Sequence, residues 1–303
     1  MTRQLVFVHG RSQQGKDSGA LKAEWIASFK EGLARNNLQL PLAESDIRFP
    51  YYGDTLDQMV KGRSAVEAVD VIVRGAESDE AEQRFMREVL AEVRKKEKIT
   101  DKKLAAVLDP DVVERGPLNW EWVQGILKAV DRYVPFASGS AVALATNDVY
   151  HYLENAVIRD EIDDGVASAI RSDLETVVVA HSLGTVVAYN ALRQRGADAG
   201  WQVPLFVTLG SPLSVKVIRD RVTALKQPRQ CPPCAQTWFN AMDERDVVAL
   251  YPLTTKAFSL NPVDPSILNK TDVSNQTENR HGISGYLNDP EVARLIYDAL
   301  TAP

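Results

Sequence analysis

The stretch of residues 176–185 constrains this chain more than any other. It begins with Thr176-Val177-Val178-Val179-Ala180, a run of apolar and β-branched residues that predicts a fully buried strand. The residues that follow the stretch predict an apolar helix. In the turn between them Ser182 is flanked by the small residues Ala180 and Gly184, which leave room for a strained serine backbone and for close contact of strand and helix. The pattern therefore predicts a serine hydroxyl at the tip of a sharp turn that follows a buried strand.

Strands and helices alternate along most of the chain. Further strands are expected at residues 4–8, 46–49, 203–209 and 237–242, with a weaker one near 256–260. Helices are expected at about residues 18–36, 56–73, 148–173, 185–195 and 291–300. This alternation predicts right-handed crossovers and a mainly parallel sheet with helices on both faces, formed by one domain of 303 residues. Ligand chemistry in such sheets takes place at the carboxyl ends of the strands.

Residues 75–147 differ from this pattern and are expected to form a mostly helical insertion. Residues 77–103 are dense in Glu, Lys and Arg, which is typical of the solvated face of a surface helix. Residues 118–145 are mainly apolar and include Trp120, Trp122 and Phe136. An apolar surface of this size is expected to be buried in a core, pressed against a partner, or laid over the mouth of a site.

Charge and composition restrict the partners of the chain. Its net charge of −6 argues against nucleic acid, because binding to phosphates favours a basic surface. Residues 1–9 lack the features of a signal peptide, and no apolar run reaches the roughly 18 residues of a membrane span, so a cytoplasmic protein is expected. Cys231 and Cys234 are the only two cysteines, and a structural role is expected for them, with a local disulfide as an open alternative. No metal site is expected.

A nucleophilic serine needs a base, and the base needs a carboxylate that fixes its tautomer. Of the four histidines, only His281 lies downstream of Ser182. Asp243 and Asp246 both follow the strand expected at residues 237–242, and either could supply the carboxylate. The other histidines near strand ends, His9 and His181, are expected to hold loops by hydrogen bonds.

Five segments of the chain together carry a resemblance to a known family. They are Val8-His9-Gly10, Ala180-His181-Ser182-Leu183-Gly184, Thr208-Leu209-Gly210-Ser211-Pro212-Leu213, Asp246-Val247-Val248, and His281 with Tyr286 beyond it. Over residues 3–53 and 148–302 the chain resembles an α/β-hydrolase of the lipase/serine-esterase type, in which the turn that carries the serine is called the nucleophile elbow. The resemblance implies an α/β-hydrolase fold with Ser182 as nucleophile, His281 as base and Asp246, rather than Asp243, as the acid. It also implies an oxyanion hole formed by the backbone N–H groups of Leu183 and Arg11.

The function implied is that of a serine hydrolase which cleaves carboxylic esters through an acyl-enzyme, with no metal or organic cofactor. Residues 75–147 would form a cap over the pocket, with Trp120, Trp122 and Phe136 as substrate contacts or, alternatively, as ordinary core residues. The apolar insertion favours a small-molecule ester with an acyl or lipid-like group, and no protein partner is identified. Two other functions stay open: a non-catalytic binding protein with a hydrolase fold, and a hydrolase that acts as an effector or toxin subunit of a larger assembly.

Overall fold

The computed structural model describes residues 3–10, 17–52, 79–108, 120–225, 230–258 and 267–303. Within these ranges six strands form one sheet in the order β2-β1-β3-β4-β5-β6, and every neighbouring pair is parallel. The predicted α/β class is therefore confirmed. The strands are β1 (Gln4–Val8), β2 (Ile47–Arg48), β3 (Thr176–His181), β4 (Val203–Leu209), β5 (Ala235–Ala241) and β6 (Leu268–Lys270).

The central strands are buried on both faces. All residues of β1 and β3 are buried, which explains why these strands are continuous apolar runs rather than alternating ones. Successive side chains point to opposite faces of the sheet: Val177 and Val179 belong to one hydrophobic cluster, and Val178 and Ala180 to the other. The pairing register places Val8 beside Ala180, so the loops that follow β1 and β3 leave the sheet at the same edge.

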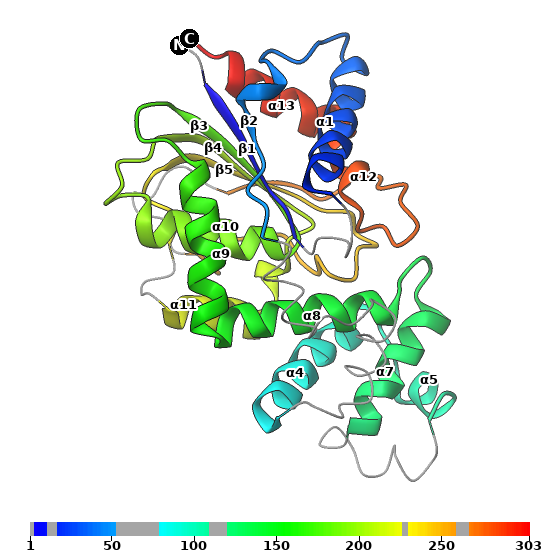
Figure 1. Ribbon diagram of the computed structural model, residues 1–303. Coiled ribbons are helices and arrows are strands. Elements are labelled where there is room, and N and C mark those ends of the chain that lie inside the picture. The colour runs from blue at the N-terminus through cyan, green and yellow to red at the C-terminus, as the bar shows by residue number, and fades with distance from the viewer. Residues whose placement is uncertain (1–2, 11–16, 53–78, 109–119, 226–229, 259–266) are drawn as a thin grey trace.

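Helices cover both faces of the sheet (Figure 1). On one face lie α1 (Ser18–Ala34), α12 (Ile283–Leu287) and α13 (Pro290–Thr301). On the other lie α9 (Ala156–Ala169), α10 (Leu183–Arg195) and α11 (Lys216–Leu225). Short 3₁₀ helices occupy Glu44–Asp46 and Pro212–Ser214.

The described part of the expected insertion is helical and lies beyond the carboxyl ends of the strands (Figure 1). It consists of α4 (Glu80–Lys96), α5 (Asp101–Ala105), α7 (Trp120–Tyr133) and α8 (Gly139–Glu154). Buried residues of these helices, such as Phe85 and Ile126, belong to the same hydrophobic cluster as Val178 of the sheet. The insertion and one face of the sheet therefore share a continuous apolar core.

Two helices predicted as single elements are divided. The charged stretch forms α4 and then α5, because Lys98 adopts a positive φ of 50° and the Thr100 side chain caps the second helix. The helix predicted at 148–173 is also wrong as a single helix. Residue 147, the expected end of the insertion, falls inside α8, and Asn155 then caps α9 by accepting hydrogen bonds from the backbone N–H groups of Val157 and Ile158.

The strand predicted near residues 256–260 is wrong in its described part, because residues 255–257 form a turn. The last strand of the sheet is instead β6, whose three residues Leu-Asn-Lys are too few and too polar to give a strand pattern. The helix expected at 56–73 lies outside the described residues.

Both cysteines are free thiols rather than a disulfide, and burial raises the pKa of Cys231 to about 11 and that of Cys234 to about 12. None of the described helices has the length and apolar character of a membrane span.

Candidate active site

Ser182 occupies a strained turn between β3 and α10. Its backbone has φ 55° and ψ −130°, a region that residues with a side chain rarely adopt. The Ser182 N–H still donates to the Leu209 carbonyl at 3.1 Å, so the residue remains attached to the neighbouring strand. The sequence prediction of a sharp strand–turn–helix with serine at its tip is confirmed.

Small residues allow the end of β1 to lie directly against this turn. A Cβ on Gly184 would lie 2.3 Å from the Val8 carbonyl oxygen, and a Cβ on Gly10 would lie 2.8 Å from the Ser182 Cβ. Neither position has room for a side chain. The sequence signal of small residues around the serine therefore reflects a close approach of two loops.

Ser182, His281 and Asp246 form a continuous row of hydrogen bonds. His281 lies on the loop between β6 and α12, and its Nε2 is 2.9 Å from the Ser182 Oγ. Its Nδ1 is 2.8 Å from the Asp246 Oδ2. A carboxylate on Nδ1 favours the tautomer that leaves the Nε2 lone pair facing the serine hydroxyl.

Asp246 is a fully buried carboxylate with several donors. Burial is the largest single influence and raises its pKa, but the charge and hydrogen bond of His281, with hydrogen bonds from Tyr286 and the Val248 N–H, together hold the pKa below its ordinary value. The Tyr286 hydroxyl donates to the Asp246 Oδ2 at 2.7 Å, and the Val248 N–H to the Oδ1 at 2.9 Å. Asp246 is therefore ionised at neutral pH.

Asp243, the other candidate acid, has a different set of contacts. Its carboxylate forms two side-chain hydrogen bonds with Arg245, of 2.9 and 2.6 Å, and accepts the Asn275 N–H at 2.9 Å. These contacts join the loop after β5 to the loop that carries His281. Of the two acids, the structure places Asp246 in contact with the His281 ring.

The hydroxyl groups of Thr185 and Ser211 also stabilise the turn that carries Ser182. The Thr185 Oγ1 donates to the Ser182 carbonyl at 2.7 Å and lies 2.7 Å from the Ser211 Oγ. The sequence pattern predicts no role for either residue. The available signal was the position of Ser211 just after the strand at 203–209, at the edge where the other site residues lie.

Of the two expected oxyanion-hole residues, Leu183 lies in the described part of the chain. Leu183 is the first residue of α10, and no described residue accepts a hydrogen bond from its N–H. A helix N-terminus presents such N–H groups to negative charge. Arg11 lies outside the described residues.

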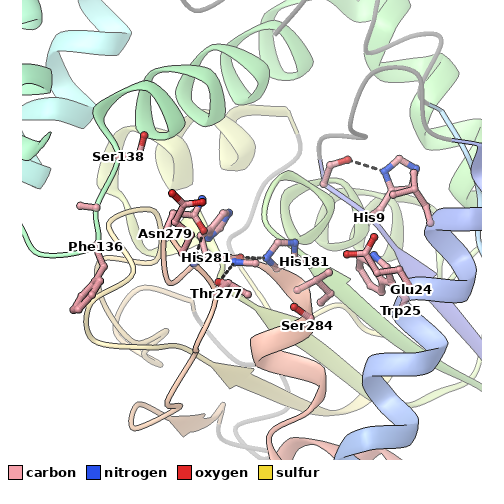
Figure 2. Close-up of a pocket in the computed structure, with 16 residues that line it drawn as sticks. His9, Glu24, Trp25, Phe136, Ser138, His181, Thr277, Asn279, His281 and Ser284 are labelled. Atoms are coloured by element: carbon pink, nitrogen blue, oxygen red, sulfur yellow. Dashed lines mark hydrogen bonds between the residues drawn. The ribbon is translucent and has the colours of Figure 1, made fainter. Parts of the chain in front are cut away.

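A cavity of about 760 Å³ adjoins His281 (Figure 2). Its walls mix polar and apolar side chains from α1, from the loop around His281 and from the segment between α7 and α8. The lining residues are His9, Gly10, Leu21, Glu24, Trp25, Phe136, Ala137, Ser138, His181, Thr277, Glu278, Asn279, His281, Gly282, Ile283 and Ser284.

The three aromatic residues expected to contact substrate lie in different places. Phe136 lines the cavity with its side chain 55% exposed, and the Arg280 guanidinium lies 4.0 Å from the centre of its ring. Trp122 is 4% exposed in the apolar core of the insertion, and Trp120 packs against the same core. Neither tryptophan is among the residues that line this cavity.

His9 and His181 hold loops by hydrogen bonds to backbone carbonyl groups, as expected. His9 Nδ1 donates to the Gly10 oxygen at 2.7 Å, and the ring stacks on Tyr52 with centroids 4.1 Å apart. His181 Nε2 donates to the His281 oxygen at 2.7 Å. Burial is the main cause that lowers the pKa of His9 to about 4 and that of His181 to about 3, so both rings are neutral at neutral pH.

Among the described residues, no group of three or more His, Cys, Asp or Glu side chains could hold a metal ion. Comparison of the chain with protein-family models, with curated proteins and with solved structures found no match.

Proposed function

We propose that this protein is a serine hydrolase of the α/β-hydrolase type that cleaves carboxylic esters. The observation that supports this most directly is the row of hydrogen bonds from the Ser182 Oγ through His281 to Asp246, with Ser182 held at positive φ between a buried strand and a helix. A strained serine, a base within 2.9 Å and a buried carboxylate behind the base are what nucleophilic acyl transfer requires.

In the proposed reaction the Ser182 Oγ attacks the ester carbonyl carbon while His281 Nε2 takes the hydroxyl proton. Asp246 stabilises the imidazolium that results. The Leu183 N–H donates to the oxyanion, and a donor of this kind is worth about 3–4 kcal/mol in the transition state. We propose the Arg11 N–H as the second donor. His281 then protonates the departing alcohol, and water activated by the same histidine hydrolyses the acyl group from Ser182.

The cavity is lined by His281 but not by Ser182, and we propose that an ester of moderate size occupies it. Its wall joins Trp25, Phe136 and Ile283 to polar groups such as Asn279 and Ser284, so it is not a uniformly apolar channel. Much of the apolar surface of the insertion is buried in the core that it shares with the sheet. We therefore propose a small-molecule ester with both apolar and polar parts, in preference to a long lipid chain. The expected cytoplasmic location stays a prediction, which cell fractionation tests.

Labelling with a fluorophosphonate probe tests the proposal, because the probe reacts with activated serines. We expect the wild-type protein to be labelled at Ser182 and to hydrolyse p-nitrophenyl acetate, and Ser182→Ala to lose both activities while remaining folded. Ser28→Ala is the control: this buried hydroxyl donates to the Glu24 carbonyl within α1. Labelling of Ser182→Ala at wild-type level would place the nucleophile elsewhere. A wild-type protein that neither reacts nor hydrolyses esters would favour the non-catalytic binding protein.

A further inference from the structure

Three hydrogen bonds within the loop that carries His281 hold this loop in shape. The His281 N–H donates to the Asn279 Oδ1 at 3.2 Å, and the Gly282 N–H donates to the Thr277 Oγ1 at 2.9 Å. The Gly282 carbonyl accepts from the Asn275 Nδ2 at 2.9 Å. All three partners belong to the same loop, so these contacts fix its shape but not its distance from Ser182.

The carbonyl of His281 has a partner from another element. It accepts the hydrogen bond from His181 Nε2 at 2.7 Å, and the two rings lie 4.8 Å apart, centre to centre, with a tilt of 36° (Figure 2). His181 is the last residue of β3 and directly precedes Ser182. This hydrogen bond therefore links the backbone of the proposed base to the strand that presents the proposed nucleophile.

We infer that His181 is a positioning residue for the proposed reaction: its Nε2–H holds the His281 carbonyl and so sets the distance between the His281 ring and the Ser182 hydroxyl. The inference rests on the proposed function. It assigns His181 no contact with the reacting atoms. A displacement of about 1 Å at a reacting pair can cost about 100-fold in rate.

The surroundings of His181 explain why a neutral donor suits this position. The ring is 8% exposed and packs near Trp25 and Tyr286, with centroids 6.2 and 5.9 Å away. Burial, and then the charge of His281, lower the pKa of His181, while its hydrogen bond to His281 and the charge of Asp246 oppose this effect. A neutral His181 donates to the carbonyl without repelling the imidazolium that forms on His281 during acyl transfer.

A matched pair of amide variants isolates this hydrogen bond. In His181→Gln the side-chain Nε2 can reach the His281 carbonyl, whereas in His181→Asn the amide is one methylene shorter and cannot. His181→Phe keeps a ring and removes the donor, and it serves as the non-donating variant if the Asn variant does not fold. The measurements are kcat and KM for p-nitrophenyl acetate, the rate of fluorophosphonate labelling, and Tm.

We expect kcat and the labelling rate of the Gln variant to stay within about threefold of wild type, and those of the Asn or Phe variant to fall about 10- to 100-fold with KM little changed. Equal kcat values in the Gln variant and a folded non-donating variant would overturn the inference. It would also be overturned if the decrease in kcat across the variants simply followed their decrease in Tm. The proposed function is judged separately, because it requires only that the wild-type protein be labelled at Ser182 and hydrolyse p-nitrophenyl acetate.

Discussion

At the scale of single residues, the contacts of each carboxylate decide what its removal should do. Asp246→Asn leaves a buried amide beside His281 Nδ1 and allows the wrong tautomer, which by analogy with other serine hydrolases lowers kcat by about 10⁴-fold. Asp243→Asn should leave kcat within about tenfold but lower Tm, because it weakens the contacts with Arg245 and Asn275. Steady-state kinetics and thermal unfolding of both variants test this pair. A larger kcat loss for Asp243→Asn would reverse the assignment.

The site shows which of its residues could be predicted from the sequence and which could not. Ser182 and His281 were identifiable from a strand–turn–helix pattern and from the scarcity of histidines. The choice of Asp246 over Asp243 came only from the family resemblance, because both residues follow the same strand and the difference lies in contacts made by distant residues. Tyr286 donates to Asp246 across 40 positions of sequence, and no local pattern predicts such a contact.

At the scale of the secondary-structure elements, Phe136 and Trp122 are expected to respond differently to truncation. Phe136 lines the cavity and is half exposed, so Phe136→Ala should raise KM for p-nitrophenyl butyrate by up to about tenfold, with little change for the acetate or in Tm. Trp122 is buried in the insertion, so Trp122→Ala should destabilise the fold by about 3–5 kcal/mol and leave the butyrate-to-acetate ratio unchanged. Identical changes of that ratio in both variants would contradict the different placement of the two rings.

The bounds of an element were predictable where its hydrophobic pattern was strong. The prediction failed where a single residue interrupts a helix. The strand predicted at 203–209 matches β4, because an apolar run buried on both faces has few alternatives. The division between α8 and α9 was missed, since residues 148–173 keep a helical pattern on both sides of Asn155. Asn155 accepts hydrogen bonds from two N–H groups of α9, and such a side-chain cap competes with continuation of the helix.

At the scale of the whole molecule, buried titratable groups make stability depend on pH. His9 and His181 have pKa values of about 4 and about 3, so between those values and the ordinary 6.5 the unfolded chain binds protons that the folded chain does not. Their contribution is complete above pH 6.5 and is lost as pH falls below it. Asp163 acts in the opposite sense: burial raises its pKa from 3.8 to about 6, so in that interval the folded chain binds a proton that the unfolded chain lacks.

Two buried histidines predict a net loss of stability with falling pH, opposed mainly by Asp163 and in the same sense by Glu92 and Glu97, whose pKa values burial raises. Each histidine contributes a slope of about 1.4 kcal/mol per pH unit, and Asp163 cancels about one of them between pH 6 and 4. The unfolding free energy of the wild-type protein, measured by urea titration, should therefore fall by about 1–2 kcal/mol from pH 6 to pH 5. His181→Gln removes one titrating group and should make this interval nearly flat. An unchanged slope in that variant would show that His181 is protonated as readily in the folded chain as in the unfolded one, which its burial beside His281 argues against.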